Sequence, residues 1–179
     1  MDNPTLELNN ADKFEIANQI VVLSTTNNGN LTNLKLQKIL FFLQAAWLVE
    51  RHHPLIDAKF SRWKLGPVES DVYHEFNHHG SSVITEPEKI FDLEKFTFVT
   101  PELAVDSYPE EDISLLIRYT NNLLAIRTYE LVQETHRESI WSDYLPEIEE
   151  QVAPNYTEGQ IINFFENHQQ DRIWNRENR

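Results

Sequence analysis

Cysteine is absent from the sequence of 179 residues, and glycine is scarce, with four residues. Without cysteine, the chain has no disulfide framework, no thiolate zinc site and no cysteine nucleophile. Phosphate-cradling loops need several glycines, because the backbone must approach the phosphates closely. Neither G-x-x-x-x-G-K-[ST] nor G-x-G-x-x-G occurs here. These absences argue against redox, thiol and nucleotide-binding chemistry.

Long apolar runs are also missing. The most apolar stretch covers residues 39–49 and is interrupted by Gln44. A membrane-spanning helix needs about 20 apolar residues, so this stretch predicts a buried core helix instead. Residues 1–4 are acidic and polar, whereas a secretory signal begins with basic residues followed by an apolar run. We therefore expect a cytoplasmic protein without a membrane partner.

Positive charge is in short supply, with 15 basic against 29 acidic residues and a net charge of -14. Non-specific binding of nucleic acid requires Lys and Arg to neutralise phosphates, so we expect no nucleic-acid partner. The acidity is uneven: residues 101–179 carry 16 acidic and 6 basic residues, and residues 1–100 carry 13 and 9. The second half could face a basic partner, or its charge could serve solubility alone.

The residues that are present indicate a folded domain. Apolar residues make up 40% of the chain and include ten Phe, six Tyr and four Trp, too many for a disordered acidic chain. We predict one domain over residues 1–179, with a core at about 12–165 and a helical tail at 166–179. Its fold class is mainly α: a compact helical domain around a buried central helix, with a small β-hairpin.

Hydrophobic periodicity places the elements. Residues 12–26 form an amphipathic helix, and Asn27–Asn30 is a strong turn signal. The helix over 32–51 is apolar nearly all round, which predicts that it lies at the centre. The remaining predicted elements are a helix over 67–79 with Pro67 at its first position and a stop at Gly80, a hairpin within 82–100, helices over 112–125 and 128–138, and a last helix opened by a capping box of Thr157 with Gln160.

One catalytic motif is matched formally. His74-Glu75-Phe76-Asn77-His78 reads H-E-x-x-H, which on a helix would offer two zinc ligands and Glu75 as general base. Gly80 ends the helix early, and no third ligand is evident, so we rank a zinc-dependent hydrolase below the other functions. Neighbouring histidines such as His78 and His79 point in different directions on a helix and make poor chelators. We therefore expect no metal and no cofactor.

Two aromatic positions and a late histidine stand out. Gly66 and Pro67 follow Trp63 and predict a rigid corner, on which a large aromatic can anchor an interface. His136 lies five residues before Trp141 and has no evident nucleophile beside it. We predict no catalytic residue and one shared partner-binding surface, although each of its members could equally belong to the core: Trp63, Tyr73, His136 and Trp141.

Three segments together resemble the Panacea domain, the SocA-like antitoxin domain of bacteria and phages. They read LTNLKLQKILFFLQAAWLV over 31–49, PLIDAKFSRWKLGPVESDVYHEF over 54–76, and ETHRESIW over 134–141. One departure is Ile140, where the family often has proline before the tryptophan. The residues that match the family motif are Lys35, Leu36, Gln37, Lys38, Trp63, Gly66, Pro67, Val68, Tyr73, Phe76, His136 and Trp141.

The resemblance implies a function that composition and spacing do not show. It implies a mostly helical, non-enzymatic antitoxin that neutralises a co-encoded protein toxin by direct contact and covers its active surface. Some relatives are thought to hand their partner to a protease, so an adaptor for proteolysis is the alternative. The family pattern requires neither His74 nor His78. A second copy of the chain is a further candidate partner.

Overall fold

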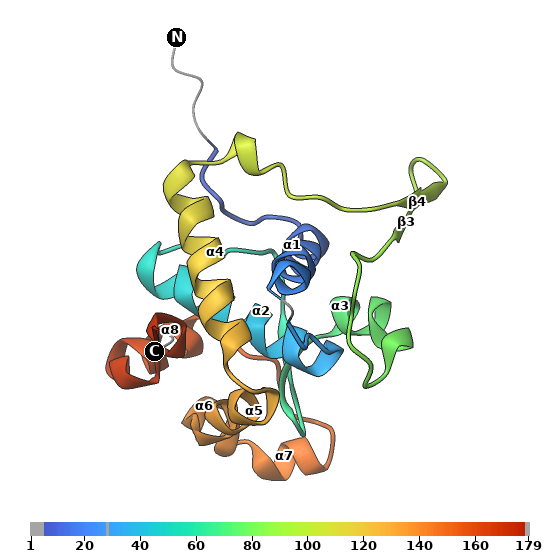
Figure 1. Ribbon diagram of the computed structural model, residues 1–179. Helices are drawn as coiled ribbons and strands as arrows, with labels where there is room; N and C mark the ends of the chain where they lie inside the picture. The colour runs from blue at the N-terminus through green and yellow to red at the C-terminus, as the bar shows by residue number, and fades with distance from the viewer. Residues whose placement is uncertain (1–5, 28, 178–179) are drawn as a thin grey trace.

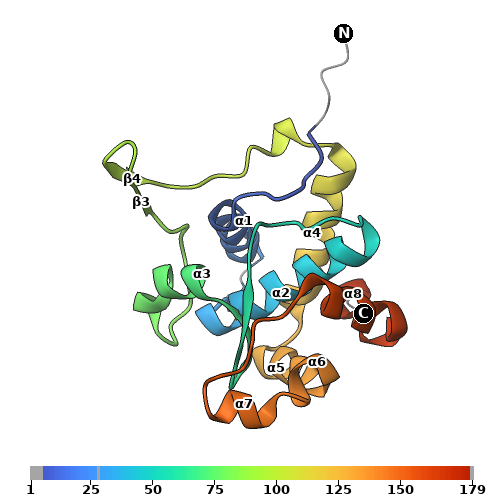
Figure 2. The ribbon, with the colours of Figure 1, turned by 180° about the vertical axis from the view of Figure 1, so that it is seen from behind.

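Helix α2 (Asn33–Glu50) lies at the centre of the computed structural model, which describes residues 6–27 and 29–177 (Figures 1 and 2). All of its residues except Leu34 and Glu50 are buried. The helix begins where the Thr32 side chain accepts a hydrogen bond from the Lys35 backbone N–H, as its N-cap. The prediction of a buried central helix is confirmed, because a helix that is apolar all round needs neighbours on every side.

Seven further α-helices surround α2 within the described residues. The N-cap of the first is Asp12, whose side chain accepts from the N–H groups of Phe14 and Glu15. The last opens with the predicted capping box of Thr157 and Gln160. The helices are α1 (Lys13–Thr26), α3 (Ser70–Glu75), α4 (Glu110–Ala125), α5 (Thr128–Arg137), α6 (Ser139–Ser142), α7 (Leu145–Glu149) and α8 (Glu158–Asn167), and the 3-10 helices are η1 (Asn77–His79), η2 (Val105–Ser107), η3 (Gln169–Asp171) and η4 (Ile173–Asn175).

Two small antiparallel hairpins complete the fold, which is mainly α with minor β as predicted. Strands β3 (Ile90–Asp92) and β4 (Thr97–Val99) form the hairpin predicted within residues 82–100. Figure 1 shows this hairpin standing away from the helices, at the end of long connecting segments. Strands β1 (Phe60–Trp63) and β2 (Gly66–Glu69) form a second hairpin beside α2.

The prediction that a helix begins at Pro67 is wrong. Pro67 lies in β2, opposite Arg62 of β1, and the helix α3 begins three residues later at Ser70. The reason is the backbone at Gly66, whose φ of +98° reverses the chain into a hairpin before a helix can form. The predicted stop at Gly80 is confirmed, because η1 ends there.

The C-terminal segment packs on the domain. Phe165 and Trp174 are fully buried, and the Trp174 indole donates a hydrogen bond of 2.7 Å to Glu50 at the end of α2. Four residues of this segment therefore belong to the hydrophobic core: Phe164, Phe165, Ile173 and Trp174. Our expectations for residues 1–4, for Asn28 and for residues 178–179 lie outside the described residues.

The acidity of the second half does not lie entirely on the surface. Asp112 is completely buried, where it forms an ion pair with Arg51 and accepts a hydrogen bond of 3.0 Å from the Leu8 backbone N–H. Glu138 is also buried, with 2% of its surface exposed. Because both side chains are buried, neither of these acidic residues can face a partner. None of the described helices has the length and apolar character needed to span a membrane.

Candidate functional site

The β1–β2 hairpin is fixed to the central helix by two buried polar side chains of α2. Lys38 donates a hydrogen bond of 2.7 Å to the Pro67 carbonyl. Gln37 accepts one of 2.9 Å from the Glu69 backbone N–H. Burial lowers the pKa of Lys38 to about 7, and the nearby charge of Glu138 partly opposes this shift. The LKLQK motif therefore holds the corner that carries Trp63.

Gly66 lies where this corner, α2 and α5 meet. A Cβ atom placed on Gly66 would lie 2.5 Å from the Thr135 hydroxyl oxygen and 3.0 Å from Cε of Lys38. The position also requires a positive φ, which only glycine adopts without strain. The structure thus explains why the sequence has glycine at this point of the motif.

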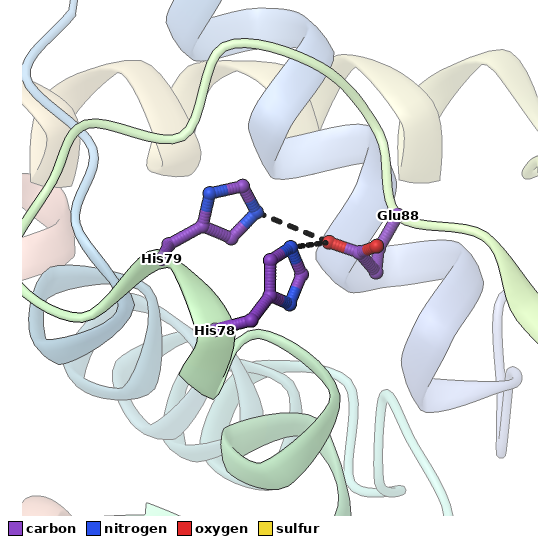
Figure 3. Close-up of side chains that lie close together, drawn as sticks. All are labelled: His78, His79 and Glu88. Atoms are coloured by element: carbon purple, nitrogen blue, oxygen red, sulfur yellow. Dashed lines mark hydrogen bonds and ion pairs between the residues drawn. The ribbon is translucent and has the colours of Figure 1, made fainter.

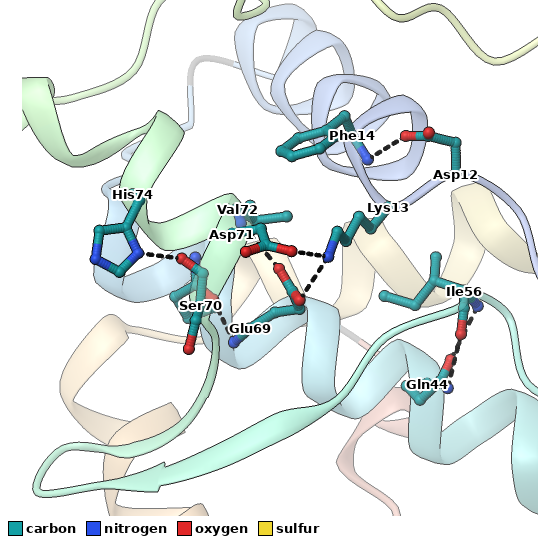
Figure 4. Close-up of polar contacts among 11 residues, drawn as sticks. Asp12, Lys13, Phe14, Gln44, Ile56, Glu69, Ser70, Asp71, Val72 and His74 are labelled. Carbon is teal, nitrogen blue, oxygen red and sulfur yellow. Dashed lines mark hydrogen bonds and ion pairs between the residues drawn. The ribbon is translucent and has the colours of Figure 1, made fainter. Parts of the chain in front are cut away.

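The far end of the hairpin is tied to α1 and α3 (Figure 4). Lys13 of α1 forms ion pairs with Glu69, at 2.9 Å, and with Asp71. Glu69 also accepts a hydrogen bond of 2.8 Å from the Val72 backbone N–H and so caps α3. Because three helices hold the hairpin at both ends, the side chains on it are well positioned in the free protein.

The structure brings together all four residues predicted to bind a partner. Trp63 and Tyr73 pack edge to face at 4.8 Å between ring centroids, and His136 stacks on Trp141 at 3.8 Å. The two pairs are linked, because the Trp141 indole donates a hydrogen bond of 3.0 Å to the Trp63 carbonyl. Trp141 is only 6% exposed, whereas the other three are half-buried. A partner can therefore contact those three directly, and Trp141 supports them.

The surroundings of His136 disfavour its protonated form. Burial lowers the pKa of His136, and so does the charge of Lys38, while a hydrogen bond with the Lys64 backbone acts in the opposite direction. Its Nε2 atom is buried and has no hydrogen-bond partner among residues 6–27 and 29–177. One ring nitrogen is therefore buried without a partner, while the ring itself stacks on Trp141.

Two grooves flank the corner. One, of about 670 Å³, is lined by Leu65 at the tip of the hairpin and by residues of α5 that include Tyr129 and His136. Leu65 and Tyr129 are 51% and 71% exposed, respectively, so their apolar surface is available to a partner. The other, of about 880 Å³, lies beside β1 and is lined by Trp63 and Glu149 among others.

Arg62 is a buried basic residue of β1 that supports the corner from within. Its guanidinium carbon lies 3.8 Å and 4.2 Å from the ring centroids of Tyr144 and Tyr156. It also donates hydrogen bonds to the carbonyl of Ile140, at 2.7 Å, and to that of Pro154, at 2.6 Å. Arg62 thus holds α6 at Ile140, the position at which the resemblance leads one to expect proline. Nothing in the sequence pattern signalled these long-range contacts.

The β3–β4 hairpin carries a second apolar surface. The rings of Phe96 and Phe98 lie 5.4 Å and 5.2 Å from that of Phe91. Phe96 is 82% exposed, Phe98 65% and Leu93 81%. The alternation of apolar and polar residues predicted the strands, but it did not show that their apolar side chains are exposed to solvent.

The H-E-x-x-H motif does not form the geometry of a zinc hydrolase. Helix α3 ends at Glu75, so His74 and His78 do not share one continuous helical face. In the described part of the chain, the group whose ligand atoms converge is His78, His79 and Glu88, without His74. The expectation that neighbouring histidines point apart is also wrong here, because the 3-10 turn brings the rings of His78 and His79 together, with 4.1 Å between their centroids and a tilt of 37°.

Comparison with known proteins identifies the family of this chain. The model of the family described as "Antitoxin SocA-like, Panacea domain" matches residues 36–142. Antitoxin SocA of Caulobacter vibrioides (strain NA1000 / CB15N) is 32% identical over 80 residues, which cover 45% of this chain and 43% of that protein. No solved structure matches. The segment matched by the family model contains the corner and both aromatic pairs.

Proposed function

The chain belongs to the SocA-like Panacea antitoxin family, and from this membership we propose that it neutralises a protein toxin by direct binding. The observation that carries the proposal is that the matched segment, residues 36–142, contains the linked aromatic residues of the corner. We propose that the protein acts in the cytoplasm, without enzymatic activity of its own and by covering the active surface of the toxin.

We propose that the toxin docks on the corner. Trp63, Tyr73 and His136 are half-buried and are held by stacking and by the indole hydrogen bond of Trp141. Large aromatic side chains dominate binding energy in many interfaces. Because these rings are already ordered, little side-chain entropy is lost when a partner covers them. The adjoining groove, with exposed Leu65 and Tyr129, offers apolar area for the same partner.

The acidic surface next to the corner supports a basic partner. Glu149 lines the groove beside Trp63, and both Glu149 and Glu150 are exposed. Charges at the edge of an interface mainly increase the association rate, and they do so most at low salt. Only exposed carboxylates can increase the association rate in this way, and Asp112 and Glu138 are buried.

Co-expression tests the proposal. The product of the neighbouring open reading frame should stop growth when expressed alone and be tolerated when this protein is present. Leu65→Glu and Tyr129→Ala should abolish protection and weaken toxin binding in calorimetry, since both residues line the groove. Val22→Ala is the matched control, because Val22 is an exposed apolar residue of α1 outside the grooves. Equal protection by all three variants would contradict docking at the corner.

The lifetime of the toxin separates occlusion from the alternative of delivery to a protease. If the protein occludes the toxin, the cellular half-life of the toxin stays the same or lengthens when the two are co-expressed. If it acts as an adaptor, the half-life shortens and the shortening depends on a protease. The second result would replace occlusion by delivery while leaving the direct contact in place.

A further inference from the structure

We propose that His78, His79 and Glu88 form a binding site for a divalent transition-metal ion of the zinc type. The Nε2 atoms of both histidines and one carboxylate oxygen of Glu88 lie within 4.8 Å of one another (Figure 3). Imidazole nitrogens with a carboxylate oxygen are a donor set that suits zinc and cobalt. The proposal departs from the expectation of no metal, and it does not depend on the proposed antitoxin function.

The distances between the donor atoms match those around a tetrahedral metal. Glu88 Oε2 lies 3.1 Å from Nε2 of His79 and 3.4 Å from Nε2 of His78. With metal–ligand distances of about 2.0–2.2 Å, two ligand atoms of a tetrahedral zinc ion are about 3.3 Å apart. Two edges of the tetrahedron are therefore present without any movement of the side chains.

The orientation of His78 favours a cation between the rings and the carboxylate. Its Nδ1 atom lies 3.0 Å from the Glu75 carbonyl oxygen, which can only accept, so Nδ1 carries a hydrogen and donates it. In the neutral imidazole, Nε2 then directs a lone pair toward a carboxylate oxygen. A metal ion relieves this repulsion, and a backbone carbonyl on the other nitrogen is the outer contact usual for a metal-binding histidine.

Glu88 is held in place from behind. Asn18 of α1, which is 3% exposed, accepts a hydrogen bond of 2.8 Å from the Glu88 N–H and donates one of 3.0 Å to the Glu88 carbonyl. The same amide donates to the Pro101 carbonyl at 2.9 Å, so it clamps both ends of the segment that carries the β3–β4 hairpin. A ligand on a clamped backbone loses little entropy when it binds a metal.

His78 and His79 lie on a turn whose last residue needs a positive φ, which glycine adopts without strain. Gly80, with a φ of +56°, ends η1 directly after His79 and turns the chain toward Glu88. The side chains of His79 and Glu88 are each 19% exposed, whereas that of His78 is 60% exposed and leaves an entry path for the ion. Three protein ligands leave the fourth position open to water or to a partner's side chain.

Metal titration of the full-length protein tests the proposal. We expect one Co²⁺ per chain by its visible absorption and one Zn²⁺ by calorimetry. Glu88→Gln and His78→Ala should each weaken binding at least about tenfold, because each removes one of three ligands. Both residues are partly exposed, so the variants should fold, and circular dichroism checks this. His74→Ala is the control, since His74 is a nearby exposed histidine outside the cluster.

Two results would overturn the proposal. If the native protein shows no saturable uptake of either metal, the cluster is an ion pair between imidazolium groups and a carboxylate. If His74→Ala loses the metal while Glu88→Gln keeps it, the ion binds the H-E-x-x-H residues instead. Neither result bears on toxin binding, so the two proposals fail separately.

Discussion

Replacing Gly66 by alanine tests whether the corner is held by close packing against α2 and α5. The added Cβ would lie 2.5 Å from the Thr135 hydroxyl oxygen and 3.0 Å from Cε of Lys38, both of which are buried. Overpacking of this kind costs about 1–3 kcal/mol. The φ of +98° adds strain of about 1–3 kcal/mol for a residue with a Cβ. We expect Gly66→Ala to lower the free energy of unfolding by about 3–5 kcal/mol.

Two other glycines separate these contributions. Gly80→Ala carries strain alone, because φ is +56° and no atom lies within 4 Å of the added Cβ. Its expected cost is about 1–3 kcal/mol, because its ψ of -121° also lies outside the left-handed helical region. Gly159→Ala in α8 has neither strain nor contact, and alanine should stabilise the helix by up to about 1 kcal/mol.

Urea unfolding followed by circular dichroism measures all three variants under the same conditions. With a slope of about 2–3 kcal/mol per molar urea, Gly66→Ala should unfold about 1–2 M earlier than the native protein. If Gly66→Ala loses no more stability than Gly80→Ala, the contacts with Thr135 and Lys38 do not hold the corner. The reasoning that connects the motif residues would then be wrong.

Further predictions concern the charged and titratable groups. The pKa of His136 is lowered in the folded state, so the unfolded chain binds a proton there more readily. The free energy of unfolding should therefore fall as the pH drops below the unfolded pKa of about 6.5, by up to about 1.4 kcal/mol per pH unit. In thermal melting at a series of acidic pH values, His136→Gln should lack this part of the loss. Asp112→Asn should cost about 3 kcal/mol in chemical unfolding, since it leaves the Arg51 cation without its buried partner, and a loss below 1 kcal/mol would refute that role. Neutralising Glu149 and Glu150 together should slow toxin association in stopped-flow mixing at low salt, and an unchanged rate would leave these charges with solubility alone.

Local sequence rules predicted most of the helical framework. The side chain of Thr157 caps its helix as the spacing with Gln160 indicated, because this cap depends on residues within three positions. The apolar circumference of residues 33–50 likewise required burial on all sides. The family motif named the members of the corner before any contact between them was known.

The predictions that were wrong share a physical cause. The contact that sets the structure at those positions comes from a distant part of the chain, or the backbone there has an unusual angle. Pro67 was assigned to a helix, but pairing with Arg62 and the positive φ of Gly66 place it in a strand. The acidity of residues 101–179 suggested a charged surface, but Asp112 is buried and is bound there by Arg51 and Leu8 from distant segments.

Local spacing and motifs were therefore enough to predict most of the helices, the burial of α2, the family and the four residues that meet at the corner. Which residues contact one another depends on the tertiary structure. It linked Trp141 to Trp63 over 78 positions, and it brought Glu88, held by Asn18 of α1, against His78 and His79. Such contacts depend on how α1, α2 and α5 pack against one another, and this packing cannot be read from the spacing of residues along the chain.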